Sequence, residues 1–358
     1  MKKSLRLALL VGASFIGLAF AGQAMAAYNP SLTIEQTSYK TGAASTIDVF
    51  IAIPENDDPT AKLTIFSPAG YTATLTQAPG TKIGAVIAQV KAKALGNAKL
   101  TLVGDVIVAD PTSPTIQAAA TQCTGKTTHS SIWVLNTTLQ GQTVAIPVFV
   151  DQVGPLVTMQ VCLPSPDVPE SMGGARFGAQ LIIADFTIAG VFRNASARGG
   201  YEWAGIYTPY TPGTATPNPA GTLEWRTYVG LPSALTLVKA KAKVGFKLIG
   251  RLVVQGLNPR GIRLNLYSGR KGNPAPNAVR AGTGKRIARM KALPATGRYS
   301  MARKNVKFAT FFQTRFENYI TDCSGPSPSG LPVPCKGEDL AAMTSNQVKA
   351  TKPRKKRR

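Results

Sequence analysis

Short apolar runs, some alternating with polar residues and some continuous, recur along the chain after residue 27. Residues 47–53 alternate in part, whereas residues 181–188 are more continuously apolar. Alternation is typical of a strand with one face in water, and a continuous run is typical of a strand buried on both sides. Turn-forming segments such as residues 54–59 and 78–80 separate the runs. The pattern predicts an all-β protein built from many short antiparallel strands.

The expected strands fall into two groups, with proline-rich loops at residues 167–174 and 208–221. The first group comprises residues 32–36, 46–53, 61–66, 82–90, 98–108, 131–135, 143–150, 156–162, 180–191, 200–207 and 222–229. The second comprises residues 234–240, 246–255, 261–267, 286–293, 298–301, 307–320 and 343–350. In the run 307–320, one face is expected to point mostly toward the core and the other mostly toward solvent. The expected core face holds Phe308, Thr310, Phe312, Thr314 and Phe316, and the expected solvent face holds Ala309, Phe311, Gln313 and Arg315. No window of a dozen residues carries a clean helical stripe without Gly or Pro.

These groups predict two antiparallel β-sandwich domains. Residues 27–230 would form a large near-neutral sandwich, and residues 231–350 a basic one with the strand count and size of an immunoglobulin-like domain. Residues 351–358 would be a disordered basic tail. Whether residues 27–230 form one domain or two stays open.

Charge separates the two parts sharply. The whole chain has a net charge of +24, but residues 27–230 hold 11 Lys and Arg against 13 Asp and Glu, whereas residues 231–358 hold 27 against 4. Like charges at this density repel, and an anionic partner relieves the repulsion. We therefore expect a polyanion contact in the second part, with a merely solvated basic surface as the alternative. The residues expected to make it are Lys239, Lys241, Lys243, Arg263, Arg270, Lys271, Lys285, Arg286, Arg289, Lys291, Lys355, Lys356, Arg357 and Arg358.

The first 26 residues have the pattern of a secretory signal peptide: Lys2, Lys3 and Arg6, then an apolar run over residues 7–20, then a small-residue cleavage site ending at Ala26. The run is shorter than the roughly 20 residues of a spanning helix, and no later stretch could span a bilayer. The pattern predicts a secreted or envelope-associated protein with no transmembrane segment after cleavage.

Export makes disulfides the expected state of the four cysteines. Of the three possible pairings, Cys123–Cys162 with Cys323–Cys335 is favoured because each pair stays within one predicted domain. A metal site lacks the usual cysteine spacing and has one histidine, His129, to draw on. The sequence predicts no metal and no cofactor. Asp57 and Asp58 could hold calcium, but a solvated turn is the simpler interpretation.

The second part resembles the immunoglobulin-like, carboxypeptidase-regulatory-like modules of secreted bacterial proteins. The resemblance depends on the strands at residues 234–240 and 246–255, the turn at residues 294–299 and the strand at residues 308–313. It covers about a third of the chain, implies a sandwich fold with a spacer or adhesion role, and carries over no functional residue. No Trp follows Trp225, so the tryptophan between the sheets of antibody domains is missing.

Together these features predict a non-enzymatic exported protein whose basic domain binds an anionic wall polymer, acidic polysaccharide or lipid headgroups, with nucleic acid as a secondary partner. A carboxylate-dependent wall or polysaccharide hydrolase is one alternative, and it needs two facing carboxylates about 5–9.5 Å apart. A pilus-like or surface-layer subunit is another. No catalytic motif occurs in the sequence.

Overall fold

The computed structural model describes residues 28–139, 142–172, 178–257, 262–269, 285–292, 296–316, 320–323 and 325–351. Over these residues the protein is all-β, with one α-helix and three short 3-10 helices. The predicted signal peptide, and residues 352–358 of the predicted tail, lie outside the described residues. Within the described ranges, no helix is long and apolar enough to cross a membrane.

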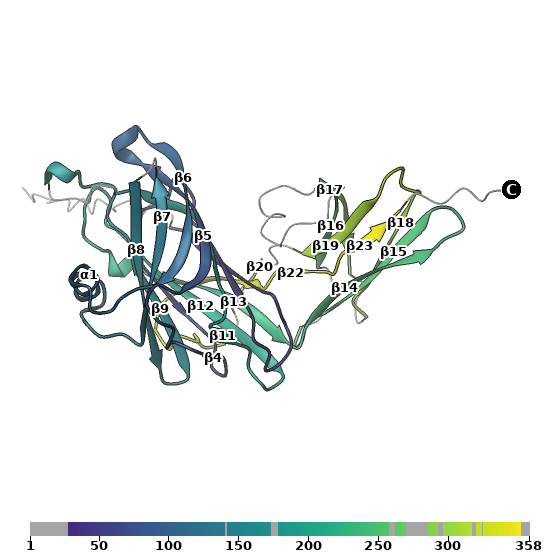
Figure 1. Ribbon diagram of the computed structural model, residues 1–358, viewed down its shortest axis with the longest axis horizontal. Helices are drawn as coiled ribbons and strands as arrows, with labels where there is room; N and C mark the ends of the chain where they lie inside the picture. The colour runs from purple at the N-terminus through teal and green to yellow at the C-terminus, as the bar shows by residue number, and fades with distance from the viewer. Residues whose placement is uncertain are drawn as a thin grey trace, which may run out of the picture.

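Figure 1 shows the strands in two groups, which we name the body (described residues within 28–231 and 320–341) and the distal unit (described residues within 232–316 and 342–351). The strands of the body are β1 (Ser31–Gln36), β2 (Ile47–Ala52), β3 (Thr60–Phe66), β4 (Thr72–Ala73), β5 (Lys82–Ala92), β6 (Ala98–Val108), β7 (Ser131–Leu139), β8 (Gln142–Val153), β9 (Leu156–Cys162), β10 (Gln180–Ile188), β11 (Phe192–Arg193), β12 (Gly199–Pro209), β13 (Leu223–Leu231), β20 (Ile320–Thr321) and β21 (Cys335–Leu340). Those of the distal unit are β14 (Ala234–Lys241), β15 (Phe246–Val253), β16 (Arg263–Gly269), β17 (Lys285–Lys291), β18 (Arg298–Arg303), β19 (Thr310–Phe316), β22 (Met343–Thr344) and β23 (Val348–Ala350).

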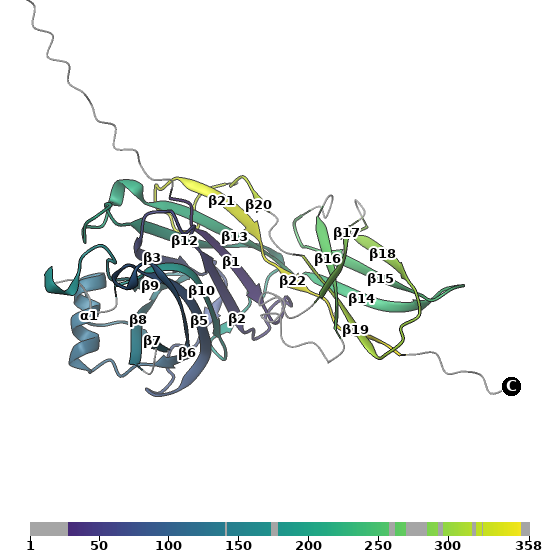
Figure 2. The ribbon, with the colours of Figure 1, turned by 90° about the horizontal axis from the view of Figure 1, so that it is seen from above.

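The described strands of the body form one long sheet in the order β1-β2-β10-β5-β6-β7-β8-β9-β3-β12-β13-β21-β20, with β4 and β11 as a separate pair. Burial alternates along β10, where Ala184, Phe186 and Ile188 face inward and Asp185 and Thr187 do not. In Figure 2 the sheet curves round on itself. A single apolar core therefore fills its concave side, with members from nearly every long strand.

Side chains tie the first strand of this sheet to its last strands. The hydroxyls of Tyr207 and Thr227 donate to the carbonyls of Ser31 and Leu32 at 3.1 and 2.9 Å. The hydroxyl of Thr33 donates to Asp339 Oδ2 at 2.6 Å. Strand β1 thus lies against β12, β13 and β21 although it pairs along its backbone with β2 alone among the described strands.

Helix α1 (Pro114–Thr124) was not predicted from the sequence. It begins at a proline, where a missing N–H costs nothing, and ends at Gly125 with φ 72°. Ala120 is its one fully buried residue, packed with Ile132 and Phe149. So little apolar surface faces the sheet that the helix leaves no amphipathic stripe in the sequence.

The distal unit consists of two sheets that share a core. Strands β14-β15-β18 form one sheet, and β17-β16-β19-β22 form the other, with β23 also paired to β19. Leu237 and Leu248 from the first sheet meet Leu264, Phe312 and Phe316 from the second in one apolar cluster. Strands occupy most of the positions expected here, with the expected strand at residues 343–350 split into β22 and β23. Phe312 and Phe316 face inward as expected. The expectation for Phe308 is wrong, because it precedes β19 and is 60% exposed.

The end of the chain returns to the body before it completes the distal unit. Strand β21 lies parallel to β13, and β20 pairs with β21, so both extend the sheet of the body. The chain then re-enters the distal unit at β22. This differs from the expected domain of residues 231–350, because a stretch in its middle belongs to the other sheet.

A buried ion pair joins the two units. Arg315 on β19 is 1% exposed and Glu35 on β1 is 4% exposed. Both guanidinium nitrogens of Arg315 donate to the Glu35 carboxylate, one of them at 2.9 Å. Beside this pair the Tyr39 hydroxyl donates to the carbonyl of Ala342 at 2.6 Å. The expectation that Arg315 faces solvent is wrong, because the face of β19 that points away from the distal core is covered by the body.

Candidate polyanion-binding site

The distal unit contains no acidic residue. All 17 Asp and Glu of the chain lie outside residues 232–316 and 342–358, and 26 of its 41 Lys and Arg lie inside them. The return of β20 and β21 to the body explains this separation, because Asp322, Glu338 and Asp339 leave with that segment. Among the described residues, the Arg315–Glu35 pair is the one ion pair that a cation of the distal unit makes with a carboxylate.

The outer face of β16 and β17 carries the densest group of arginines. Arg263 lies directly opposite Lys291, and Arg289 opposite Asn265. These cations are exposed, and Arg286 and Lys285 further along β17 are exposed too. Side chains directly opposite on one face stand about 4.5–5.5 Å apart at Cβ, a distance at which like charges destabilise the sheet.

The outer face of the other sheet is sparser and partly apolar. Lys247, Arg251 and Arg298 are exposed there, and Arg251 lies directly opposite Arg298. Arg251 Nε donates to the carbonyl of Thr296 at 3.0 Å. Val238 and other small apolar residues separate the cations on this face.

A third group of cations lies at the end of the distal unit away from the body. These cations are exposed on the last residues of β14 and in the hairpin loop that follows, in the connection from β18 to β19, and on β23. The members of the group are Lys239, Lys241, Lys243, Lys304, Lys307 and Lys349. Lys349 Nζ lies 5.4 Å from the centre of the Phe311 ring.

The described members of the predicted site lie on two of these three surfaces. Lys239, Lys241 and Lys243 lie at the far end, and Arg263, Lys285, Arg286, Arg289 and Lys291 lie on β16 and β17. Arg270, Lys271, Lys355, Lys356, Arg357 and Arg358 lie outside the described residues. Sequence analysis left out Lys247, Arg251, Lys304, Lys307 and Lys349. Lys247, Arg251 and Lys349 lie on strands, and Lys304 and Lys307 lie in the connection between β18 and β19.

Both predicted disulfides are confirmed. Cys123 and Cys162 have Cα atoms 5.6 Å apart, and they link the end of α1 to β9. Cys323 and Cys335 have Cα atoms 6.3 Å apart and close the loop before β21. In that loop the Ser327 hydroxyl donates to the buried carboxylate of Glu224 at 2.6 Å. The bridges therefore brace the body, not the cationic surfaces.

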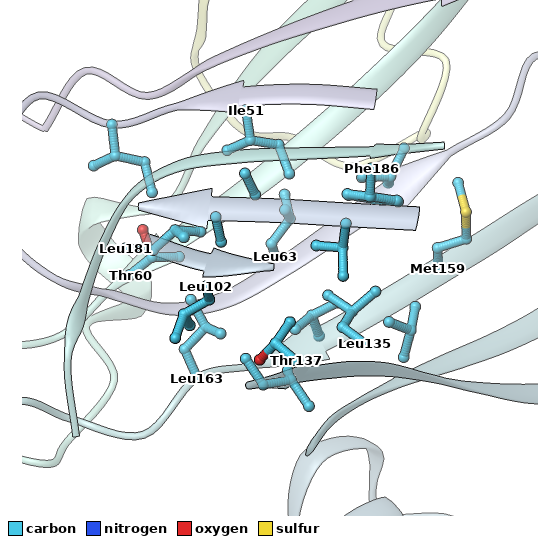
Figure 3. Close-up of a pocket in the computed structure, with 18 of the residues that line it drawn as sticks. Ile51, Thr60, Leu63, Leu102, Leu135, Thr137, Met159, Leu163, Leu181 and Phe186 are labelled. Carbon is cyan, nitrogen blue, oxygen red and sulfur yellow. The ribbon is translucent and has the colours of Figure 1, made fainter. Parts of the chain in front are cut away.

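The interior of the body contains an apolar cavity of about 50 Å³, with side chains from several strands directed into it in Figure 3. Its few hydroxyls have other partners, because Thr60 hydrogen-bonds to Tyr28 at 2.7 Å and Thr137 donates to the carbonyl of Val144 at 2.9 Å. An engineered cavity that binds benzene has about three times this volume. The cavity is therefore a packing void.

A polar surface pocket of about 320 Å³ lies over the loops around Asp57 and Asp167. Lys93 Nζ lies 2.7 Å from Asp167 Oδ1 and pins two of these loops together. Burial raises the pKa of Asp57 and of Asp58, and the charge of Asp167 raises that of Asp58 further. Over the described ranges, no group of three His, Cys, Asp or Glu side chains is arranged to hold a metal ion.

The side chain of His129 is buried, and both of its ring nitrogens have hydrogen-bond partners. Its Nδ1 lies 2.9 Å from Asp151 Oδ2 and its Nε2 lies 3.1 Å from Thr124 Oγ1. This is the connectivity of a hydrolase triad. However, the Thr124 hydroxyl also lies 2.9 Å from the carbonyl of Ala120, and the imidazole is shielded from solvent. The trio fastens the loop between α1 and β7.

No family model matches this chain, and no curated protein matches it. A solved structure, the three N-terminal domains of the bacteriophage RB49 Highly Immunogenic Outer Capsid protein (Hoc), aligns with 92% of this chain and 100% of its own length. The identity is 12% and the TM-score is 0.21, too low to support an argument about fold or function.

Proposed function

We propose that this chain is an exported, non-enzymatic surface or extracellular protein, whose distal unit binds an anionic envelope polymer or surface. The observation that carries the proposal is the charge separation: residues 232–316 and 342–358 hold 26 cations and no acid, whereas the body holds every described carboxylate. Such a unit repels itself, and a partner with repeated negative charge relieves that repulsion.

In this proposal the distal unit is an immunoglobulin-like β-sandwich and the body is a larger sandwich. Two sheets around one core, with Tyr299 hydrogen-bonded to Thr314 across them at 2.6 Å, support the first assignment. The spacer or adhesion role implied by the resemblance of these strands to secreted modules agrees with it.

Export is supported by two independent features. The first is the signal-peptide pattern of residues 1–26. The second is the pair of disulfides, with no free cysteine among the described residues. Disulfides persist in oxidising compartments and are rare in the cytosol.

The proposal has a direct test on a phosphocellulose column. The chain from Ala27 onward should be retained and should leave steeply with added salt, because screening weakens exposed charge contacts. Changing Arg263, Arg289 and Lys291 to Gln should lower the salt needed for elution. Changing Lys82, Lys93 and Lys99 of the body to Gln removes the same charge and is the matched control. Elution of the parent chain at low salt, or equal shifts in both variants, would contradict the proposal.

A further inference from the structure

The end of the distal unit away from the body brings three chain segments together. They are the β14–β15 hairpin loop (residues 242–245), the β18–β19 connection (residues 304–309) and residues 349–351; we name them the tip. Phe246 pairs with Arg303, and its ring lies 5.6 Å from that of Phe312. Figures 1 and 2 both show this hairpin at the far end of the molecule.

The contacts within the tip are close. At Gly245, which has φ 75°, a side chain would collide with the carbonyl of Arg303, so the hairpin loop lies directly on the start of the β18–β19 connection. Thr310, just after that connection, pairs with Ala350 at the end of β23. The three segments therefore form one surface.

The tip combines lysines with two large exposed apolar side chains. Val244 is 79% exposed and Phe308 is 60% exposed. Lys243 stands next to Val244 and Lys307 next to Phe308, and the other lysines of the tip are exposed as well. The basic sequence of residues 352–358 continues directly from Thr351.

We infer that the tip docks on an anionic lipid bilayer, with Val244 and Phe308 entering the headgroup region while the lysines contact lipid phosphates. A soluble polyanion offers charge but no apolar phase, whereas a bilayer surface offers both. Lysine suits this position because its long stem lets the ammonium stay at the headgroups beside an inserted apolar group. This inference rests on the proposed function and names its partner.

The outer face of β14 and β15 gives a matched comparison. Val238 and Val253 there are 56% and 40% exposed, beside Lys247 and Arg251. They lie within strands β14 and β15 and are tied to the sheet, whereas Val244 and Phe308 lie in loops between strands. A loop can enter a headgroup layer without bringing the sheet with it, so only the tip pair should contribute to bilayer binding beyond charge.

The test is sedimentation of the chain from Ala27 onward with vesicles of phosphatidylcholine containing a quarter phosphatidylglycerol. At 0.1 M salt the parent chain should bind these vesicles and ignore pure phosphatidylcholine. At 0.5 M salt screening removes most of the charge term, but apolar insertion survives. There Val244→Ser with Phe308→Ser should weaken binding about tenfold, and Val238→Ser with Val253→Ser should leave it unchanged. Both pairs are exposed, so thermal unfolding should confirm that each variant folds.

A fluorescence readout separates insertion from charge. The native tryptophans Trp133, Trp203 and Trp225 are all buried and give a constant background. Phe308→Trp should shift its emission to the blue with phosphatidylglycerol vesicles and not with soluble polyphosphate, whereas Val238→Trp should shift with neither. An unshifted Phe308→Trp, or serine variants that bind vesicles like the parent, would overturn the inference. If phosphocellulose retention remained, the proposed function would stand; if retention were lost too, both would fail.

Discussion

The body and the distal unit place their charges in opposite ways on similar β-sheets. In the body, three exposed lysines have acidic partners: Lys82 lies 2.7 Å from Asp105, Lys93 lies 2.7 Å from Asp167, and Lys99 lies 2.5 Å from Glu55. In the distal unit, Arg263 faces Lys291 across two strands, and no described acid of the unit is available to either. Both units fold by burying apolar residues on one face of each strand. Folding therefore does not require the cationic surface, and its repulsion opposes folding.

The two arrangements meet at the Glu35–Arg315 pair. An acid from the body there neutralises a cation from the distal unit inside a buried junction. Tyr39 packs against the cores of both units at the same place. The junction thus has the charge complementarity that Arg263 and Lys291 lack on the outer face of β16 and β17.

The largest expected effect on the free energy of unfolding comes from removing one member of the Glu35–Arg315 pair. Arg315→Ala takes away the guanidinium that faces the Glu35 carboxylate and leaves a buried charge, at a cost of about 3–5 kcal/mol. Glu35→Leu with Arg315→Met removes both charges and should cost clearly less. Urea denaturation measures both variants. Costs that simply add in Glu35→Leu, Arg315→Met and their combination would show that the two side chains are not coupled.

Removing either disulfide is the next largest effect on the free energy of unfolding. The 12-residue separation of Cys323 and Cys335 corresponds to about 3 kcal/mol of loop entropy, and the 39-residue separation of Cys123 and Cys162 to about 4 kcal/mol. Double alanine variants, compared by denaturation, should show both losses. Because neither bridge touches the cationic surfaces, phosphocellulose retention of each folded variant should match the parent chain. A fall in retention would mean that the returning loop contributes to binding.

A smaller effect on the free energy of unfolding is expected at Glu202 on β12, which feels the charges of Glu224 on β13 and Glu338 on β21. Burial raises the pKa of its carboxyl, the charges of Glu338 and Glu224 raise it further, and nearby Arg226 only partly compensates. A carboxyl with a folded pKa above its unfolded value is penalised when ionised, so stability is lost above the folded pKa and regained as pH falls through it. Glu202→Gln should therefore be more stable than the parent at pH 7, and the difference should shrink by pH 4.5.

Denaturation of both proteins at several pH values measures this difference. Asp110, whose pKa is lowered by hydrogen bonds from Thr112, is the control of opposite sign. Asp110→Asn should not stabilise at pH 7. A Glu202→Gln protein that is less stable than the parent at pH 7 would show that the attraction of Arg226 outweighs burial.

The strand pattern of this protein is predictable from sequence because alternation and turn residues are local properties. The features that the sequence pattern did not predict depend on contacts between segments that lie far apart in the chain. Strand β21 contains Glu338 and Asp339 and lacks an apolar run, yet both residues are buried against the body. Arg315 does point away from the distal core, as alternation predicts, but no local pattern predicts that Glu35 covers it.

In the candidate site, too, local sequence predicts one part and contacts between distant segments determine the rest. Net charge per segment predicted the cationic nature of the second half, and exposure of the described candidates agrees with it. The distribution over two faces and the tip could not be predicted, because it depends on which strands are neighbours and in which register. The burial of His129 depends in the same way on Asp151, which lies 22 residues further along the chain.

The smallest expected change in stability separates the effect of the cations on folding from their effect on binding. Lys291→Glu places a carboxylate opposite Arg263, giving the distal unit the cross-strand pairing found in the body, and should stabilise it by about 0.5 kcal/mol. The same variant should leave phosphocellulose at lower salt. Lys247→Glu is the control, because its neighbours in register are Ala240 and Ala302: it should lower retention similarly without the gain in stability. A Lys291→Glu variant that is more stable but binds phosphocellulose more weakly would mean that the repulsion is retained for contact with a partner. A less stable Lys291→Glu variant would mean that the cations already stabilise the fold.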